Sequence, residues 1–168
     1  MSNFPKLIPA FTAQIAIQAP TAVGATARGG LLTHVIILPE STIVSEPDYP
    51  IKLDATFVHG ADYIKADPDG RNVRLEVQSL VQDKATGALV RFNYTGTSAM
   101  GGPNGKVLRG EPDAATTPYG EVFTHPVFET GSGPLAALQD KTYVGSGRFV
   151  LEAGKPVTVE YKISEVVA

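Results

Sequence analysis

The sequence contains no cysteine among its 168 residues and little charge of either sign. The lack of cysteine excludes disulfide bonds, thiolate metal ligands and a cysteine nucleophile. It is compatible with a reducing compartment, and we therefore expect a cytoplasmic protein. Charged residues make up 18% of the chain, the formal net charge is −3, and no run of lysine and arginine exceeds two residues. The sequence thus offers no basic surface for nucleic acid or for an anionic membrane.

Long apolar runs and helical periodicity are also missing. No apolar run approaches the roughly 20 residues that a membrane-spanning helix needs. Pro9, Thr12 and Gln14 interrupt the apolar stretch near the N-terminus, so we interpret it as a strand, with a signal peptide as the minor alternative. No window sustains apolar residues at spacings of three and four, which excludes long helices. The length is typical of one domain, which we expect over residues 1–168.

What the sequence has instead is two-residue alternation broken by turn residues. Residues 71–82 alternate most clearly, with Val73, Leu75 and Val77 on one face and polar side chains on the other. Residues 51–58 alternate in the same way, and an Asp-Pro-Asp-Gly turn lies between the two segments. Alternation of this kind is typical of strands with one face in the core and one in solvent.

About ten such segments indicate an all-β protein, either a closed antiparallel barrel of eight to ten strands or a sandwich. We expect strands over residues 8–18, 31–38, 41–46, 51–58, 61–65, 71–82, 88–94, 120–128, 141–152 and 156–166, and one helical turn at 134–139. Residues 19–30 are expected to form a loop. Residues 97–118 break all periodicity, and we expect a long loop there that is mobile or covers the mouth of a barrel.

Several short elements resemble a known family. They are residues 59–63 (HGADY), 75–76 (LE), 87–90 (GALV), 123–131 (FTHPVFETG) and 143–148 (YVGSGR). Together they resemble the family called domain of unknown function 3237, and the resemblance implies a lipocalin-like β-barrel. Four departures are visible: His59 replaces a glycine, Glu76 replaces an aspartate, residues 97–118 do not align with the family, and the family's Leu-Asn pair before residues 143–148 is missing, with Leu138-Gln139 nearby.

Three residues are candidates for acid–base catalysis. Asp62 lies in the family element, and we interpret it as a carboxylate at the barrel mouth, with a turn-capping aspartate as the alternative. Alternation places Glu76 on the outer face, whereas the family's acidic residue at this position favours the lumen, so both remain open. His125 is the third candidate, because a histidine near a carboxylate titrates near neutrality. We expect the three side chains to converge on one concavity.

Other residues are candidates for binding a substrate. Tyr63, Tyr94 and Tyr143 have hydroxyl groups that donate hydrogen bonds to an oxygen, although aromatic residues in barrels more often pack in the core. Phe123 shares a strand face with His125, and Arg109 lies where the long loop would fold over the opening. The sequence contains no phosphate-binding loop, no zinc-spaced histidine pair and no nucleophile elbow, so we expect no metal and no cofactor.

These features predict a cofactor-independent acid–base enzyme that isomerises, cyclises or dehydrates a small, partly apolar carbonyl or aromatic metabolite, as in secondary metabolism. A non-catalytic binding or carrier barrel is the first alternative, and a structural or interaction protein is the second. The expected partner is a small-molecule ligand, and the sequence leaves self-association into a homo-oligomer open.

Overall fold

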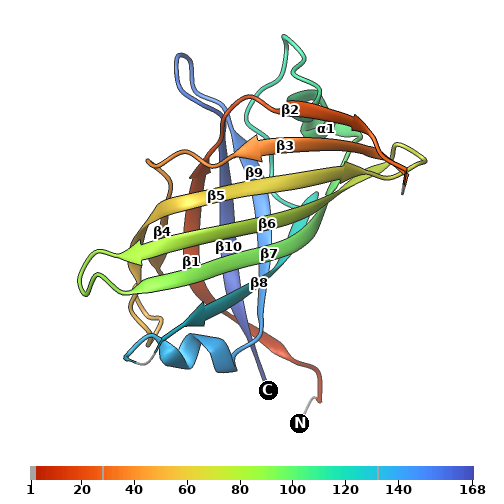
Figure 1. The fold of residues 1–168 in the computed structure, drawn as a ribbon. Coiled ribbons are helices and arrows are strands. Elements are labelled where there is room, and N and C mark those ends of the chain that lie inside the picture. The colour runs from red at the N-terminus through yellow and green to blue at the C-terminus, as the bar shows by residue number, and fades with distance from the viewer. Residues whose placement is uncertain (1–2, 28, 132) are drawn as a thin grey trace.

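The computed structural model describes residues 3–27, 29–131 and 133–168 and shows a barrel of long, tilted strands (Figure 1). The described residues form ten strands and two short helical segments. The strands are β1 (Lys6–Ala16), β2 (Thr21–Ala25), β3 (Leu31–Ile36), β4 (Thr42–Ser45), β5 (Asp54–Ala66), β6 (Asn72–Asp83), β7 (Leu89–Ala99), β8 (Val122–Thr130), β9 (Tyr143–Val150) and β10 (Thr158–Val167). The helical segments are α1 (Gly102–Leu108) and the 3-10 turn η1 (Ala136–Asp140).

All strand pairs are antiparallel, and the sheet closes on itself. The strand order is β2-β3-β5-β4-β1-β10-β9-β8-β7-β6, and an additional pairing of β5 with β6 completes the ring. Eight strands form the closed barrel, and two further strands extend from it. The prediction of an all-β antiparallel barrel with little helix is therefore confirmed. Among the described residues, neither helical segment nor any other helix has the length and apolarity to cross a membrane.

Strand β5 contains a bulge that changes which side chains point inward. Ala55 and Phe57 are buried, but the register with β6 shifts between Phe57 and His59. Since a bulge inserts one extra residue, the inward phase moves by one position after it. Asp62 consequently lines the interior, whereas its neighbour Tyr63 is 42% exposed on the outer face.

An aromatic cluster fills the half of the barrel near η1. The rings of Phe11, Phe128 and Tyr143 pack within 5.0 to 5.8 Å of one another, measured between centroids. Buried Tyr49 donates a hydrogen bond of 2.6 Å to Glu165 and lies 2.9 Å from the Tyr143 hydroxyl. Aromatic side chains therefore fill this end of the barrel, and the cavity described below lies toward the other end.

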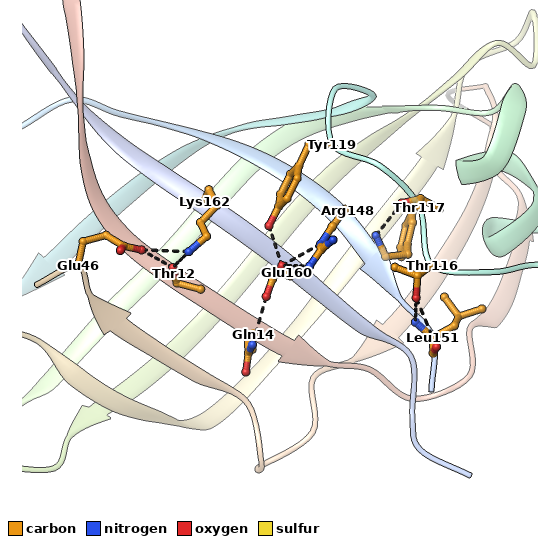
Figure 2. A network of polar contacts seen from close by, with 11 residues as sticks. Thr12, Gln14, Glu46, Thr116, Thr117, Tyr119, Arg148, Leu151, Glu160 and Lys162 are labelled. Atoms are coloured by element: carbon orange, nitrogen blue, oxygen red, sulfur yellow. Dashed lines mark hydrogen bonds and ion pairs between the residues drawn. The ribbon is translucent and has the colours of Figure 1, made fainter. Parts of the chain in front are cut away.

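The end opposite η1 is covered by α1 and by the β2–β3 hairpin (Figure 1). The Arg109 guanidinium donates to the Met100 carbonyl at 2.7 Å and so joins the two ends of α1. The chain then runs along the outside of the barrel, where the Thr116 hydroxyl accepts the Leu151 N–H at 2.9 Å. Tyr119 donates to Glu160 at 2.7 Å, and Arg148 lies over the Tyr119 ring and also binds Glu160 (Figure 2). These contacts hold the segment that follows α1 against the barrel wall.

The structure differs from the expected elements in three places. Residues 19–30 contain β2 in addition to a loop, and the segments expected at 51–58 and 61–65 belong to one continuous strand, β5. Residues 97–118 were expected to lack regular structure, but β7 extends to Ala99 and α1 follows. The helical turn expected at residues 134–139 corresponds to η1.

Candidate functional site

A cavity of about 430 Å³ occupies the α1 end of the barrel. Its entrance is formed by Gln18 and Pro20 after β1, by Pro156 before β10, and by Val107 and Leu108 of α1. The walls are largely aliphatic and come from most strands of the barrel. The other described lining residues are Ile15, Ile17, Ala19, Val35, Ile37, Leu38, Asp62, Ile64, Leu75, Tyr94, Ser98, Val122, Phe149, Val157, Val159 and Tyr161.

Of the described residues that line the cavity, Asp62 alone carries a charged side chain. The register pairs Asp62 with Val77 on β6 and Val77 with Tyr94 on β7, so Asp62 and Tyr94 lie in one cross-strand row. One carboxylate oxygen of Asp62 accepts the backbone N–H of Glu76 at 2.9 Å. Glu76 thereby fixes the orientation of the carboxyl group through its backbone, while the Asp62 side chain lines the cavity.

Burial raises the pKa of Asp62 to about 6. The side chain faces the cavity on one side and protein atoms on the others, so its charged form is poorly solvated. The hydrogen bond from the Glu76 N–H partly opposes this rise, because it favours the carboxylate, and the negative charge of the Glu76 side chain adds a small increase. Asp62 therefore exchanges a proton within about one unit of neutral pH, where an acid–base catalyst works best.

Tyr94 and Tyr161 form the floor of the cavity beside Asp62. Their rings meet edge to face with centroids 5.2 Å apart, and Tyr94 also packs on Phe92 of the aromatic cluster. Both are almost fully buried, at 5% and 3% exposure. Burial raises the pKa of each tyrosine well above its usual range, and the negative charge of Asp62 adds to the effect on both. Both hydroxyls are therefore neutral at physiological pH. A hydrogen bond between the two side chains uses one hydroxyl proton, so the pair can donate the other to a ligand.

Gly147 on β9 makes room for the Tyr161 ring. A Cβ atom at Gly147 would lie 2.5 Å from Cε1 of Tyr161, far inside van der Waals contact. Tyr161 and Gly147 are direct register partners across β10 and β9. The side-chain-free position on β9 thus allows Tyr161 to lie against the wall beside Tyr94.

The other two candidate catalytic residues lie outside the barrel. Glu76 points outward from β6, where its side chain is 50% exposed and forms an ion pair of 3.2 Å with Lys65. His125 is exposed on the outer face of β8. The structure therefore does not bring Asp62, Glu76 and His125 together, because the barrel wall separates Asp62 from the other two. The inward alternation of β6 and β8 at Leu75 and Thr124 is the physical reason.

The candidate binding residues are also distributed over different places. Tyr94 lies in the cavity, whereas Tyr63 and Phe123 line a shallow outer groove of about 400 Å³ with Glu76 and His125. Tyr143 belongs to the buried hydrogen-bonded group at the η1 end, next to Tyr49.

Arg109 has a local role. Besides the Met100 carbonyl, its guanidinium binds Glu111 at 2.7 Å, and this pairing holds the end of α1 and not a ligand.

Sequence reasoning missed Tyr161 and Ser98. Tyr161 alternates with Val159 and Ile163 on the apolar face of β10, and this alternation was the signal that could have placed it inside. Ser98 gave no comparable signal, since it lies in the segment expected to be a loop. No described group of three or more histidine, aspartate or glutamate side chains has an arrangement suited to a metal ion.

The fold and the cavity define the class of this protein: a lipocalin-like β-barrel with an internal pocket at one end. Residues 5–166 match the family model described as protein of unknown function (DUF3237). The chain belongs to this family, as the short elements in the sequence predicted. The curated proteins contain no match to this sequence.

Solved structures share this fold at low sequence identity. A conserved protein of unknown function from Rhodopseudomonas palustris is 22% identical, with 99% of this chain and 100% of that chain covered and a TM-score of 0.75. A β-barrel-like protein from Acinetobacter baumannii is 20% identical, with coverage of 99% and 98% and a TM-score of 0.70. An enzyme from Penicillium herquei is 16% identical, with coverage of 99% and 97% and a TM-score of 0.62. At these identities the likeness shows the fold alone.

Proposed function

We propose that the protein is a cofactor-independent acid–base enzyme that acts on a small, partly apolar carbonyl or aromatic compound inside the barrel. The observation that carries the proposal is Asp62, a single carboxyl group with a raised pKa in a largely apolar cavity, beside two tyrosine hydroxyls. A protein that only holds an apolar ligand has no use for a poorly solvated carboxylate, which costs stability when it ionises. The Penicillium herquei neighbour is an enzyme on the same fold, which supports catalysis as a use of this barrel.

The geometry supports a proton transfer next to a carbonyl group. The Asp62 carboxylate takes a proton from the carbon beside the carbonyl, and the electron pair of that C–H bond moves to the carbonyl oxygen. Tyr94 or Tyr161 donates a hydrogen bond to that oxygen as its negative charge develops, which stabilises the enolate. Asp62 then returns the proton to carbon, at the same or at a conjugated position. The result is an isomerisation with no net gain or loss of protons.

Hydrogen–deuterium exchange of a model ketone tests this step without knowledge of the natural substrate. 2-Tetralone is neutral, mostly apolar and has acidic protons beside its carbonyl group. We expect the wild-type protein to accelerate their exchange in deuterated water, followed by NMR. In Asp62→Asn, the exchange rate above background should fall by about a hundredfold or more, because this substitution removes the base. His125→Ala is the matched control, because His125 lies outside the barrel, and it should exchange like the wild type.

A carrier barrel is the second candidate, and the aliphatic lining of the cavity favours it. The same experiment separates the two functions. If 2-tetralone binds in the cavity but exchanges no faster than in buffer, the enzyme proposal fails and the carrier function takes its place.

A further inference from the structure

The polar groups of the cavity lie at its two ends, with apolar walls between them. Asp62, Tyr94 and Tyr161 lie at the floor. Near the entrance, the lining includes Ser98 on β7 and Gln18 after β1. Leu75 on β6 pairs with Gly96, which lies midway between Tyr94 and Ser98 on β7, so an apolar side chain of the cavity wall separates the two. A ligand that fills this space therefore meets hydrogen-bonding groups only at its ends.

The Ser98 hydroxyl is buried and can form a shorter hydrogen bond than the one it has. Ser98 is 1% exposed, and within the described part of the chain its hydroxyl makes one long hydrogen bond, to the Ala99 carbonyl at 3.5 Å. That distance is at the limit of hydrogen bonding. A buried hydroxyl without a good partner costs free energy, and a ligand oxygen within reach would recover it.

The strand geometry gives the distance between the two ends. Tyr94 and Ser98 both point inward from β7 and are separated by four residues, so their Cα atoms lie about 13 Å apart along the strand. Hydrogen bonds at both ends shorten this span, so ligand oxygens that reach both residues lie about 10 Å apart. The cavity volume of about 430 Å³ corresponds to roughly fourteen water-sized groups.

We propose that the substrate is an elongated, uncharged compound of about two rings with an oxygen at each end, one held at the floor and the other hydrogen-bonded to Ser98. This substrate class rests on the proposed function, since the floor oxygen is the one that Tyr94 and Tyr161 polarise. An anionic group at the floor is disfavoured, because it would meet the carboxylate of Asp62. Val107 and Leu108 of α1 lie over the entrance, where they cover the Ser98 end of the ligand.

Two biphenyl compounds test the hydrogen bond to Ser98, because they differ only in the oxygen that would accept or donate it. 4-Hydroxybiphenyl offers an oxygen at one end, and 4,4′-dihydroxybiphenyl offers oxygens at both ends, about 10 Å apart. We expect the wild-type protein to bind the diol about fivefold more tightly by titration calorimetry, which corresponds to about 1 kcal/mol. Ser98→Ala should abolish this preference and leave the affinity for 4-hydroxybiphenyl unchanged, which also shows that the cavity is intact. Ser146→Ala, on the outer face of β9, is the matched control and should keep the preference.

Three results would overturn this inference: equal binding of the two biphenyls by the wild type, a preference that survives in Ser98→Ala, or no binding of either compound. None of them bears on catalysis, which the exchange of 2-tetralone decides separately. Conversely, loss of the exchange activity with the diol preference intact would remove the proposed function and leave a carrier with the same ligand class.

Discussion

Replacing Asp62 by asparagine should change how the stability of the protein depends on pH. Asparagine has the same shape, and its side-chain oxygen can still accept the Glu76 N–H, so the substitution removes the titration and little else. In the wild type, the pKa of Asp62 is raised to about 6 from the ordinary value of about 4 for an unfolded chain. The folded state therefore binds the proton more tightly than the unfolded state, and wild-type stability falls as pH rises through this range.

The size of the effect follows from the two pKa values. A difference of about two units corresponds to about 3 kcal/mol of destabilisation once the group is fully ionised. Between about pH 4.5 and about pH 8, about 2 kcal/mol of this change should appear. The unfolding free energy of Asp62→Asn minus that of the wild type should therefore grow by about 2 kcal/mol across this interval.

Urea denaturation at a series of pH values measures this difference, because the linear extrapolation gives the unfolding free energy of each protein. Asp67→Asn is the control. Arg74 lowers the pKa of Asp67 through their hydrogen bonds, so Asp67 is already ionised throughout the interval and this variant should differ from the wild type by a constant amount. If the difference in unfolding free energy between Asp62→Asn and the wild type also stays constant across the pH series, Asp62 is well solvated. That result would refute the reasoning about the cavity.

Three further predictions concern the surroundings of the site. Gly147→Ala should displace the Tyr161 ring, lower the unfolding free energy by about 1–3 kcal/mol and weaken 2-tetralone binding; unchanged stability and binding would contradict the close packing. Tyr49→Phe removes the donor to buried Glu165 and should cost about 1–3 kcal/mol in urea denaturation while 2-tetralone exchange stays normal; a loss of exchange would connect the two ends of the barrel. Limited proteolysis should cut first within residues 97–118, and 4,4′-dihydroxybiphenyl should slow the cut; first cleavage elsewhere would argue against movement of α1 at the entrance.

The fold was predictable because alternation and turn chemistry agree along most of the chain. In β6, the inward residues Val73, Leu75 and Val77 alternate with the outward polar residues Arg74, Glu76 and Gln78, and the structure follows this alternation. The same pattern placed Glu76 on the outer face, where it lies, even though the family resemblance favoured the lumen. Alternation on a strand is therefore a stronger guide to the direction of a side chain than a motif at the same position.

The site was harder to predict, for physical reasons that differ between strands. In β5, the bulge at Val58 and His59 shifts by one position which side chains point inward. No residue type in that segment predicts the bulge. In β8, the inward positions include Thr124 and Pro126, so the apolar signal that would have placed His125 outside is weak. Residues 102–108 contain two glycines and a proline, which favour a loop in isolation. Only the packing against the barrel end makes α1 stable there.

The pH dependence of 2-tetralone exchange tests the central claim most directly, since it joins the carboxylate, its environment and the reaction in one measurement. The active form of Asp62 is the carboxylate. The exchange rate above background in the wild type should therefore rise with pH, with an inflection near the raised pKa of Asp62, about 6, and then level off. Asp62→Asn should show no such inflection. An inflection that persists in Asp62→Asn, or one near pH 4 in the wild type, would contradict the assignment of Asp62 as the base in a poorly solvated cavity.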